Sequence, residues 1–306
     1  MFAFRAMNPR FPILFVALSA TSLAYGQFAW QRAEERDPAE VERIVGEIGK
    51  LEPSRDLNIV WVWGIDKMHG KGYHEYAWVM DRYVNDLLCT VPRVTVTPAM
   101  HFPSDEQWEK ADLVVFYLHV NETRKNDPWD YDAIDRYQKR GGGLIFLHFA
   151  LAEGSGVELA KRVGLSMSRT SKWGIMYSPV SLTAAAANSP IFEGFPAQFE
   201  LPEEHYWALT GDVTAITPLV TSPAGPAIEN KGSDGPPKLE DLDGKPWPVM
   251  WTKEVGKGKV FATVAGHNFF TYNDPYFRII LLRAMAWTMN ESFDPFKPLV
   301  TMRTGR

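Results

Sequence analysis

The sequence predicts an α/β protein built on a mostly parallel sheet with helices on both faces. Three largely apolar runs of strand length lie at residues 58–63, 112–119 and 144–149. Such runs are typical of strands that are covered on both faces. Segments with helical patterning follow them, and strand and helix alternating at this spacing indicates a parallel sheet.

The remaining elements follow from the same patterns and from capping residues. Asp37 and Pro38 are typical of a helix N-cap and of the first helical position. Helices are expected at 37–50, 73–88, 104–110, 127–140, 156–163 and 275–289. A further strand is expected at 93–97, and a hairpin is expected to pair 249–252 with 259–264. Asp127 and Pro128 open the fourth of these helices, and glycines 141–143 end it.

One region breaks the alternation. Residues 165–245 contain several prolines and a polar stretch at 222–246. We interpret them as an irregular insertion that covers part of the sheet and ends in a long surface loop. No linker divides the chain into two cores, so a single domain is expected.

Composition excludes several classes of function. The 306 residues are 45% hydrophobic with a net charge of −5 and no basic patch, so no nucleic-acid partner is expected. The single cysteine, Cys89, excludes an intrachain disulfide and a multi-cysteine metal site, and we expect it to be buried. The chain lacks dinucleotide-binding, Walker A, His-Glu-x-x-His and Gly-x-Ser-x-Gly motifs, which argues against nucleotide-phosphate and serine-hydrolase functions.

The N-terminal segment has the pattern of a secretory signal peptide. Arg5 and Arg10 precede an apolar run at 11–20, and small residues precede Gln27. The alternative is an uncleaved anchor, although the run is short for a membrane span. We therefore divide the chain into a signal peptide 1–26, an N-terminal extension 27–56, a domain 57–290 and a tail 291–306. A secreted or periplasmic protein is expected, without membrane contact after cleavage. The sequence leaves both a monomer and a homo-oligomer as alternatives.

Histidines concentrate where the predicted strands end. In an open parallel sheet, ligands bind beyond the carboxyl ends of the strands. We therefore expect four imidazoles at one rim of the sheet: His74, His119, His148 and His267. The alternatives are a buried core histidine at 148 and a strand cap at 119. His69 and His101 are interpreted as ordinary loop residues.

A second polar group lies in the insertion, at residues 203–207 (EEHYW). It combines carboxylates and an imidazole with two aromatic rings. This mixture suits a sugar site, with aromatic faces for C–H surfaces and carboxylates for hydroxyls. The alternative is a polar surface turn.

Five stretches together resemble the ThuA-like (trehalose utilisation) family. They are 72–75 (GYHE), 141–148 (GGGLIFLH), 203–207 (EEHYW), 248–268 (PVMWTKEVGKGKVFATVAGHN) and 272–287 (YNDPYFRIILLRAMAW). The resemblance covers roughly residues 57–290. It implies a flavodoxin-like three-layer sandwich similar to class I glutamine amidotransferases, and a role in disaccharide metabolism, including routes through 3-keto sugars. Amidotransferases carry a nucleophilic cysteine after the third strand, whereas 147–150 here is LHFA, so glutamine hydrolysis through a thiolate is not expected.

Three functions follow as hypotheses. The first is an enzyme on a small carbohydrate or its oxidised derivative, with His148 and His267 as acid/base groups and Glu204 as a carboxylate partner. Substrate-binding roles are then assigned to His74, Glu75, His119, His205, Tyr206, Trp207 and Asn268. No cofactor is certain; a divalent metal ion would take its ligands from His74, His148, His205, His267 and Glu204. The second is a non-catalytic sugar-binding protein, and a third is partner binding through the 222–246 loop.

Overall fold

The computed structural model describes residue 33 and residues 35–119, 129–168, 171–174, 179–223, 226–229, 239–241 and 244–302. The predicted signal peptide lies outside these residues, as do Asp127 and Pro128 and much of the 222–246 loop. The expectations of a signal peptide and of a surface loop there stay predictions, whereas the helix expected to open at Asp127 and Pro128 begins at Tyr131 instead, because Asp130 caps it. Within the described part of the chain, no helix combines the length and the apolar character needed to cross a bilayer.

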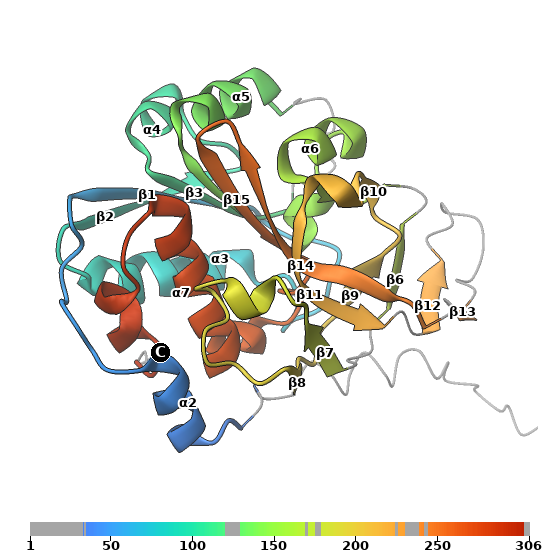
Figure 1. The fold of residues 1–306 in the computed structure, drawn as a ribbon. Coiled ribbons are helices and arrows are strands. Elements are labelled where there is room, and N and C mark those ends of the chain that lie inside the picture. The colour runs from blue at the N-terminus through green and yellow to red at the C-terminus, as the bar shows by residue number, and fades with distance from the viewer. Residues whose placement is uncertain are drawn as a thin grey trace, which may run out of the picture.

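A nine-stranded mixed sheet runs through the described residues, in the order β2-β1-β3-β4-β15-β14-β11-β7-β8 (Figure 1). The first five strands are parallel neighbours: β2 (Val94–Met100), β1 (Leu57–Trp63), β3 (Leu113–Tyr117), β4 (Gly143–Leu147) and β15 (Gly258–Thr263). The other four pair antiparallel: β14 (Pro246–Val255), β11 (Thr217–Pro223), β7 (Pro179–Leu182) and β8 (Gln198–Glu200). The α/β class, the parallel sheet and the β14–β15 hairpin are therefore confirmed.

The position of each parallel strand follows from its residues. β3 and β4 are buried along their whole length, as their continuous apolar runs require. β2 is mostly exposed and contains Pro98, which lacks a backbone N–H and suits an edge strand. The apolar strands therefore occupy the middle of the parallel half, where both faces are covered.

Helices cover both faces of the sheet and make three layers (Figure 1). One layer contains α4 (Asp105–Lys110), α5 (Tyr131–Arg140) and α6 (Gly156–Val163), and the other contains α3 (Tyr76–Asp81) and α7 (Pro275–Met289). Asp274 caps α7 and Pro275 opens it, as the sequence predicts, and the helix is buried almost throughout. α2 (Pro38–Val45) packs on α7 but ends five residues before the predicted end, at the Gly46 C-cap. Short 3₁₀ turns lie at Leu88–Thr90, His148–Ala152, Ala186–Asn188, Val213–Ala215, Phe269–Asn273 and Asp294–Leu299.

The predicted helix at 73–88 is shorter and less regular than expected. α3 begins at Tyr76, and the chain then forms a π-helix at Arg82–Leu87 and the 3₁₀ turn that follows it. Leu87 and Leu88 face the core while Cys89 is exposed, so the prediction of a buried cysteine is wrong. The change from α to π and then to 3₁₀ winding alters which side chains face inward, and an ideal 3.6-residue period cannot anticipate it.

The region 165–245 is more ordered than the sequence suggests. β7, β8 and β11 extend the main sheet, so the expectation of an irregular insertion is wrong for them. Two smaller sheets are formed by β5 (Leu165–Ser166) with β10 (Thr210–Gly211), and by β13 (Leu239–Asp241), β12 (Pro226–Glu229), β6 (Lys172–Gly174) and β9 (His205–Trp207). Most of these strands have two to four residues, which is too short for a periodic signal.

Candidate functional site

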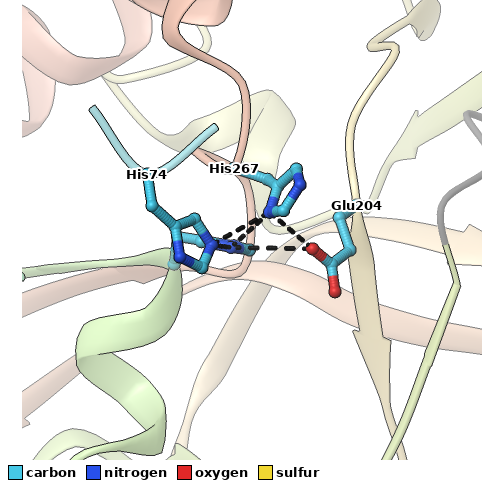
Figure 2. A group of neighbouring side chains, drawn as sticks. His74, Glu204 and His267 are labelled. Atoms are coloured by element: carbon cyan, nitrogen blue, oxygen red, sulfur yellow. Dashed lines mark hydrogen bonds and ion pairs between the residues drawn. The ribbon is translucent and has the colours of Figure 1, made fainter. Parts of the chain in front are cut away.

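Three imidazoles from distant parts of the chain meet a carboxylate at the carboxyl ends of the parallel strands. His74 lies between β1 and α3, His148 follows β4 directly, His267 follows β15, and Glu204 precedes β9. His74, Glu204 and His267 point toward one another (Figure 2). We call His74, His148, Glu204 and His267 the cluster. All four residues are buried, with at most 7% of their surface exposed.

The polar atoms of the cluster are in close contact. Nε2 of His74 lies 2.9 Å from Nε2 of His148 and 2.9 Å from Nδ1 of His267, and the last two atoms are 3.3 Å apart. Oε2 of Glu204 lies 2.6 Å from Nδ1 of His267 and 3.9 Å from Nε2 of His148. Three ring nitrogens and one carboxylate oxygen therefore converge on a common point.

The backbone holds two of these histidines in a sparsely populated conformation. His74 has φ +50° and His148 has φ +52°, in the left-handed region that non-glycine residues rarely adopt. Such residues cost about 1–3 kcal/mol each and concentrate at functional sites. The backbone N–H of His74 donates to the carbonyl of His267 at 2.9 Å, which ties the two loops together. The strained turn at His148 also occupies the place where the resemblance to amidotransferases would put a nucleophile.

A second layer of groups orients the rings. Nδ1 of His148 lies 2.7 Å from the carbonyl oxygen of Val264, and Nδ1 of His74 lies 3.1 Å from Oδ2 of Asp66. Carbonyl oxygens only accept hydrogen bonds, so Nδ1 of His148 carries a proton, and the nearby Asp66 carboxylate favours the same tautomer of His74. The Nε2 lone pairs of both neutral rings therefore face into the cluster.

Glu203 fixes the two loops that carry Glu204 and His267. Its Oε2 accepts the backbone N–H groups of Glu204 and His267, each at 3.0 Å. Its Oε1 accepts the backbone N–H of Asn268 at 3.2 Å and the hydroxyl of Thr271. One buried carboxyl group thus sets the relative position of two cluster residues.

The electrostatic environment separates the rings. Burial lowers the pKa of His74 to about 4 and, together with the neighbouring imidazoles, holds the pKa of His148 well below its usual value. Burial also opposes the charged form of His267, but the carboxylate of Glu204 outweighs it and raises the pKa of that ring. Burial would raise the pKa of Glu204, yet His267 lowers it. These shifts favour two neutral rings, His74 and His148, beside an ion pair of His267 and Glu204.

Two more predicted residues of the EEHYW stretch take different positions. The Tyr206 hydroxyl lies 2.9 Å from Nε2 of His148, and its ring stacks on that imidazole. Burial raises the pKa of Tyr206 far above its usual value, so the hydroxyl keeps its proton. His205 faces the opposite way, with Nδ1 3.0 Å from Oγ of Ser222, and Trp207 is buried beside it. The structure does not bring His205 into the cluster.

The other predicted binding residues support loops near the cluster. His119 pairs with Glu153 at 2.7 Å and packs its ring against Phe149, which also contacts His74. Glu75 accepts the backbone N–H of Gly72. Asn268 forms an isolated β-bridge with Tyr73 and donates its side-chain amide to the carbonyl of Pro202. His74 itself lies in this loop rather than at a helix start.

Sequence reasoning missed two residues of the loop between β1 and α3. Asp66 lies 2.5 Å from Nδ1 of His69 as well as 3.1 Å from His74. The His69 ring lies 4.0 Å from that of His74 and 5.6 Å from that of His267, and 27% of its side chain is exposed. His69 is therefore a solvent-accessible group at the cluster's edge. The Asp-x-x-His spacing at 66–69 was the available signal.

Comparison with known proteins now identifies the family. Residues 64–288 match the model of ThuA, described as trehalose utilisation, and this range contains the whole cluster. The chain belongs to the ThuA family. This family match agrees with the resemblance found in the sequence.

Solved structures of ThuA-like proteins share the fold. A putative ThuA-like protein from Bacteroides uniformis is 15% identical, with 79% of this chain and 95% of that chain covered and a TM-score of 0.53. One from Parabacteroides merdae is 17% identical, with 77% and 90% covered and a TM-score of 0.50. A comparison with curated proteins gave no match. The structural likenesses support the α/β architecture of this ThuA-family chain.

Proposed function

We propose that this ThuA-family chain is an enzyme that acts on a carbohydrate or on an oxidised derivative such as a 3-keto sugar, with the cluster as its catalytic centre. The observation that carries the proposal is the convergence of three imidazoles and a carboxylate on one point. Buried charges and left-handed histidines are costly, so the arrangement is poor as a stabilising device. The family description, trehalose utilisation, favours a carbohydrate substrate.

The chemistry of the cluster suits proton transfer beside a ketone or at a glycosidic oxygen. His267 and Glu204 form a hydrogen-bonded pair, which is the arrangement of an acid/base imidazole and its partner carboxylate. Tyr206 keeps its proton and is placed to donate it beside His148. The cluster can act in two ways: its imidazoles transfer protons themselves, or they hold a cation that polarises a sugar oxygen. Neither way needs a cysteine nucleophile.

A ligand screen tests the substrate class. A true ligand at 100 times its Kd stabilises the protein by about 2.7 kcal/mol. For a domain of this size, that raises the melting temperature by about 5–11 °C. We expect such a shift with at least one member of a panel of disaccharides and their 3-keto derivatives, and none with glycerol at the same concentration. A folded protein that no panel member stabilises would contradict the carbohydrate proposal.

Removal of one hydroxyl tests catalysis. We expect Tyr206→Phe to reduce turnover about 100-fold for a ligand that raised the melting temperature, because proton donation is lost. Binding of that ligand should persist. Turnover is followed by NMR of the sugar. Tyr137→Phe is the matched control, since the Tyr137 hydroxyl is also buried but bonds the carbonyl of Gly143, away from the cluster. Full activity in Tyr206→Phe would remove its catalytic role, and binding without turnover in the unmodified protein would favour the sugar-binding alternative.

A further inference from the structure

We propose that the cluster binds one divalent transition-metal ion through Nε2 of His74, Nε2 of His148, Nδ1 of His267 and Oε2 of Glu204. These four atoms all lie within 4.8 Å of one another. The proposal goes beyond the proposed function, because it concerns the ion alone and holds whether or not the ligand is a sugar.

Hydrogen bonding leaves part of the cluster unpaired. The carbonyl of Val264 places the proton of His148 on Nδ1, and the carboxylate of Asp66, 3.1 Å from Nδ1 of His74, favours the same tautomer there. The Nε2 atoms of the two rings are 2.9 Å apart, so their lone pairs face each other, and the Tyr206 hydroxyl can pair only with that of His148. A proton on Nδ1 of His267 can point at only one of its three close neighbours. A cation at the centre accepts all of these lone pairs at once.

The spacing of the four donor atoms is close to that around a tetrahedral metal ion. Zinc binds nitrogen and oxygen at about 2.0–2.2 Å with tetrahedral geometry, which sets neighbouring donor atoms about 3.3–3.5 Å apart. Five of the six separations between the four donors lie between 2.6 Å, for Glu204 and His267, and 3.9 Å, for Glu204 and His148, and all six are within 4.8 Å. They bracket the tetrahedral value, so small side-chain movements admit an ion.

The groups behind the donors orient the histidine rings as metal ligands are oriented. Ligand histidines usually donate their other ring N–H to a carboxylate or a backbone carbonyl, which fixes the ring and its tautomer. His74 has Asp66 in this role and His148 has the carbonyl of Val264. The carboxylates of Glu204 and Asp66 together also balance the two positive charges of the ion.

The donor set selects the class of metal. Imidazole suits zinc and its transition-metal neighbours, whereas magnesium and calcium prefer oxygen ligands. Three nitrogens and one oxygen therefore favour Zn²⁺, with Co²⁺ as a spectroscopic substitute. The Tyr206 hydroxyl, 2.9 Å from a donor atom, and the partly exposed His69 lie beside the ion's position. They are the groups that face a molecule bound to the metal.

Titration of the chelator-treated full chain with Zn²⁺, followed by calorimetry, tests the site. We expect one equivalent to bind. His74→Gln and Glu204→Gln are expected to weaken binding at least about 100-fold, and Asp66→Asn, which alters only the outer layer, about 10- to 100-fold. X-ray absorption of the loaded protein should give nitrogen and oxygen donors at about 2.0–2.2 Å.

Two histidine variants provide matched controls. His205→Gln removes a fully buried imidazole next to Glu204 but outside the cluster, and His101→Gln removes a partly buried one that follows β2 and is also outside the cluster. Both should bind Zn²⁺ within about twofold of the unmodified chain, since neither contributes a donor. Circular dichroism checks that each variant is folded. If His74→Gln or Glu204→Gln is unfolded, His267→Asn takes its place as the variant that lacks a donor. Folded protein that binds no Zn²⁺, or binding that His74→Gln, Glu204→Gln and His267→Asn leave intact, overturns the proposal.

The two proposals fail in different ways. Stoichiometric Zn²⁺ binding without any response to the sugar panel would retain the metal site and remove the carbohydrate substrate. A sugar response in a chain that binds no Zn²⁺ would retain the substrate class and leave direct proton transfer by the imidazoles.

Discussion

Replacement of Glu203 by glutamine is expected to lower the free energy of unfolding by about 2–4 kcal/mol, which corresponds to about 4–16 °C in melting temperature. The carboxylate accepts three backbone N–H groups and one hydroxyl. A glutamine amide can accept on one oxygen only, and its NH₂ group then faces two buried donors. Removal of a buried charge offsets part of this loss, since burial raises the pKa of Glu203 and so penalises its charged form.

The Glu203→Gln variant should also weaken the cluster, because the segments that carry Glu204 and His267 lose their common acceptor. Urea denaturation measures the stability and the Zn²⁺ titration measures the site. Glu200→Gln is the matched control, since it makes the same chemical change on an exposed side chain three residues earlier. Equal stability of the two variants would show that Glu203 does not organise the loops.

Replacement of Gly266 by alanine is expected to destabilise the protein by about 2–5 kcal/mol. Gly266 has φ +127°, a conformation that costs other residues about 1–3 kcal/mol. A Cβ atom would lie 2.6 Å from the hydroxyl oxygen of Tyr272 and 3.2 Å from Cβ of His148, and such overpacking costs about 1–3 kcal/mol more. The chain must move, and His267 and His148 move with it.

Gly70→Ala controls for the substitution itself. A Cβ atom at Gly70 meets nothing within 4 Å, and its φ is not in the left-handed range. We expect thermal melting of Gly70→Ala to match the unmodified protein, while Gly266→Ala melts lower and binds Zn²⁺ more weakly. Unchanged melting of Gly266→Ala would mean that the His148 turn tolerates a side chain there and is less tightly packed than the structure indicates.

Much of the parallel half of the sheet could be predicted from the sequence, because buried strands leave continuous apolar runs. The same pattern placed His148 and His267 after strands, and the geometry of a parallel sheet brings such positions to one edge. Glu204 could also be predicted as a site residue, because EEHYW combines polar and aromatic groups. The contacts among these residues depend on loops, and no periodicity encodes a loop's path.

The failures have separate physical causes. Asp66 and His69 lie in a glycine-containing loop whose course is set by tertiary contacts, so their proximity to His74 leaves no regular signal. Cys89 follows a π-helix, which breaks the period used to judge its burial. His205 and Tyr206 are neighbours in β9 and point to opposite faces, so Tyr206 reaches His148 while His205 faces away from the cluster.

The sequence separation of the donors affects when an ion can be captured. His74 and His267 are 193 residues apart and follow β1 and β15, so they come together once β1, β3, β4 and β15 are paired in the sheet. An unfolded or half-synthesised polypeptide therefore offers no strong chelating site. Metal loading would be the final step of maturation, and the occupied protein would by that fact be a correctly assembled one.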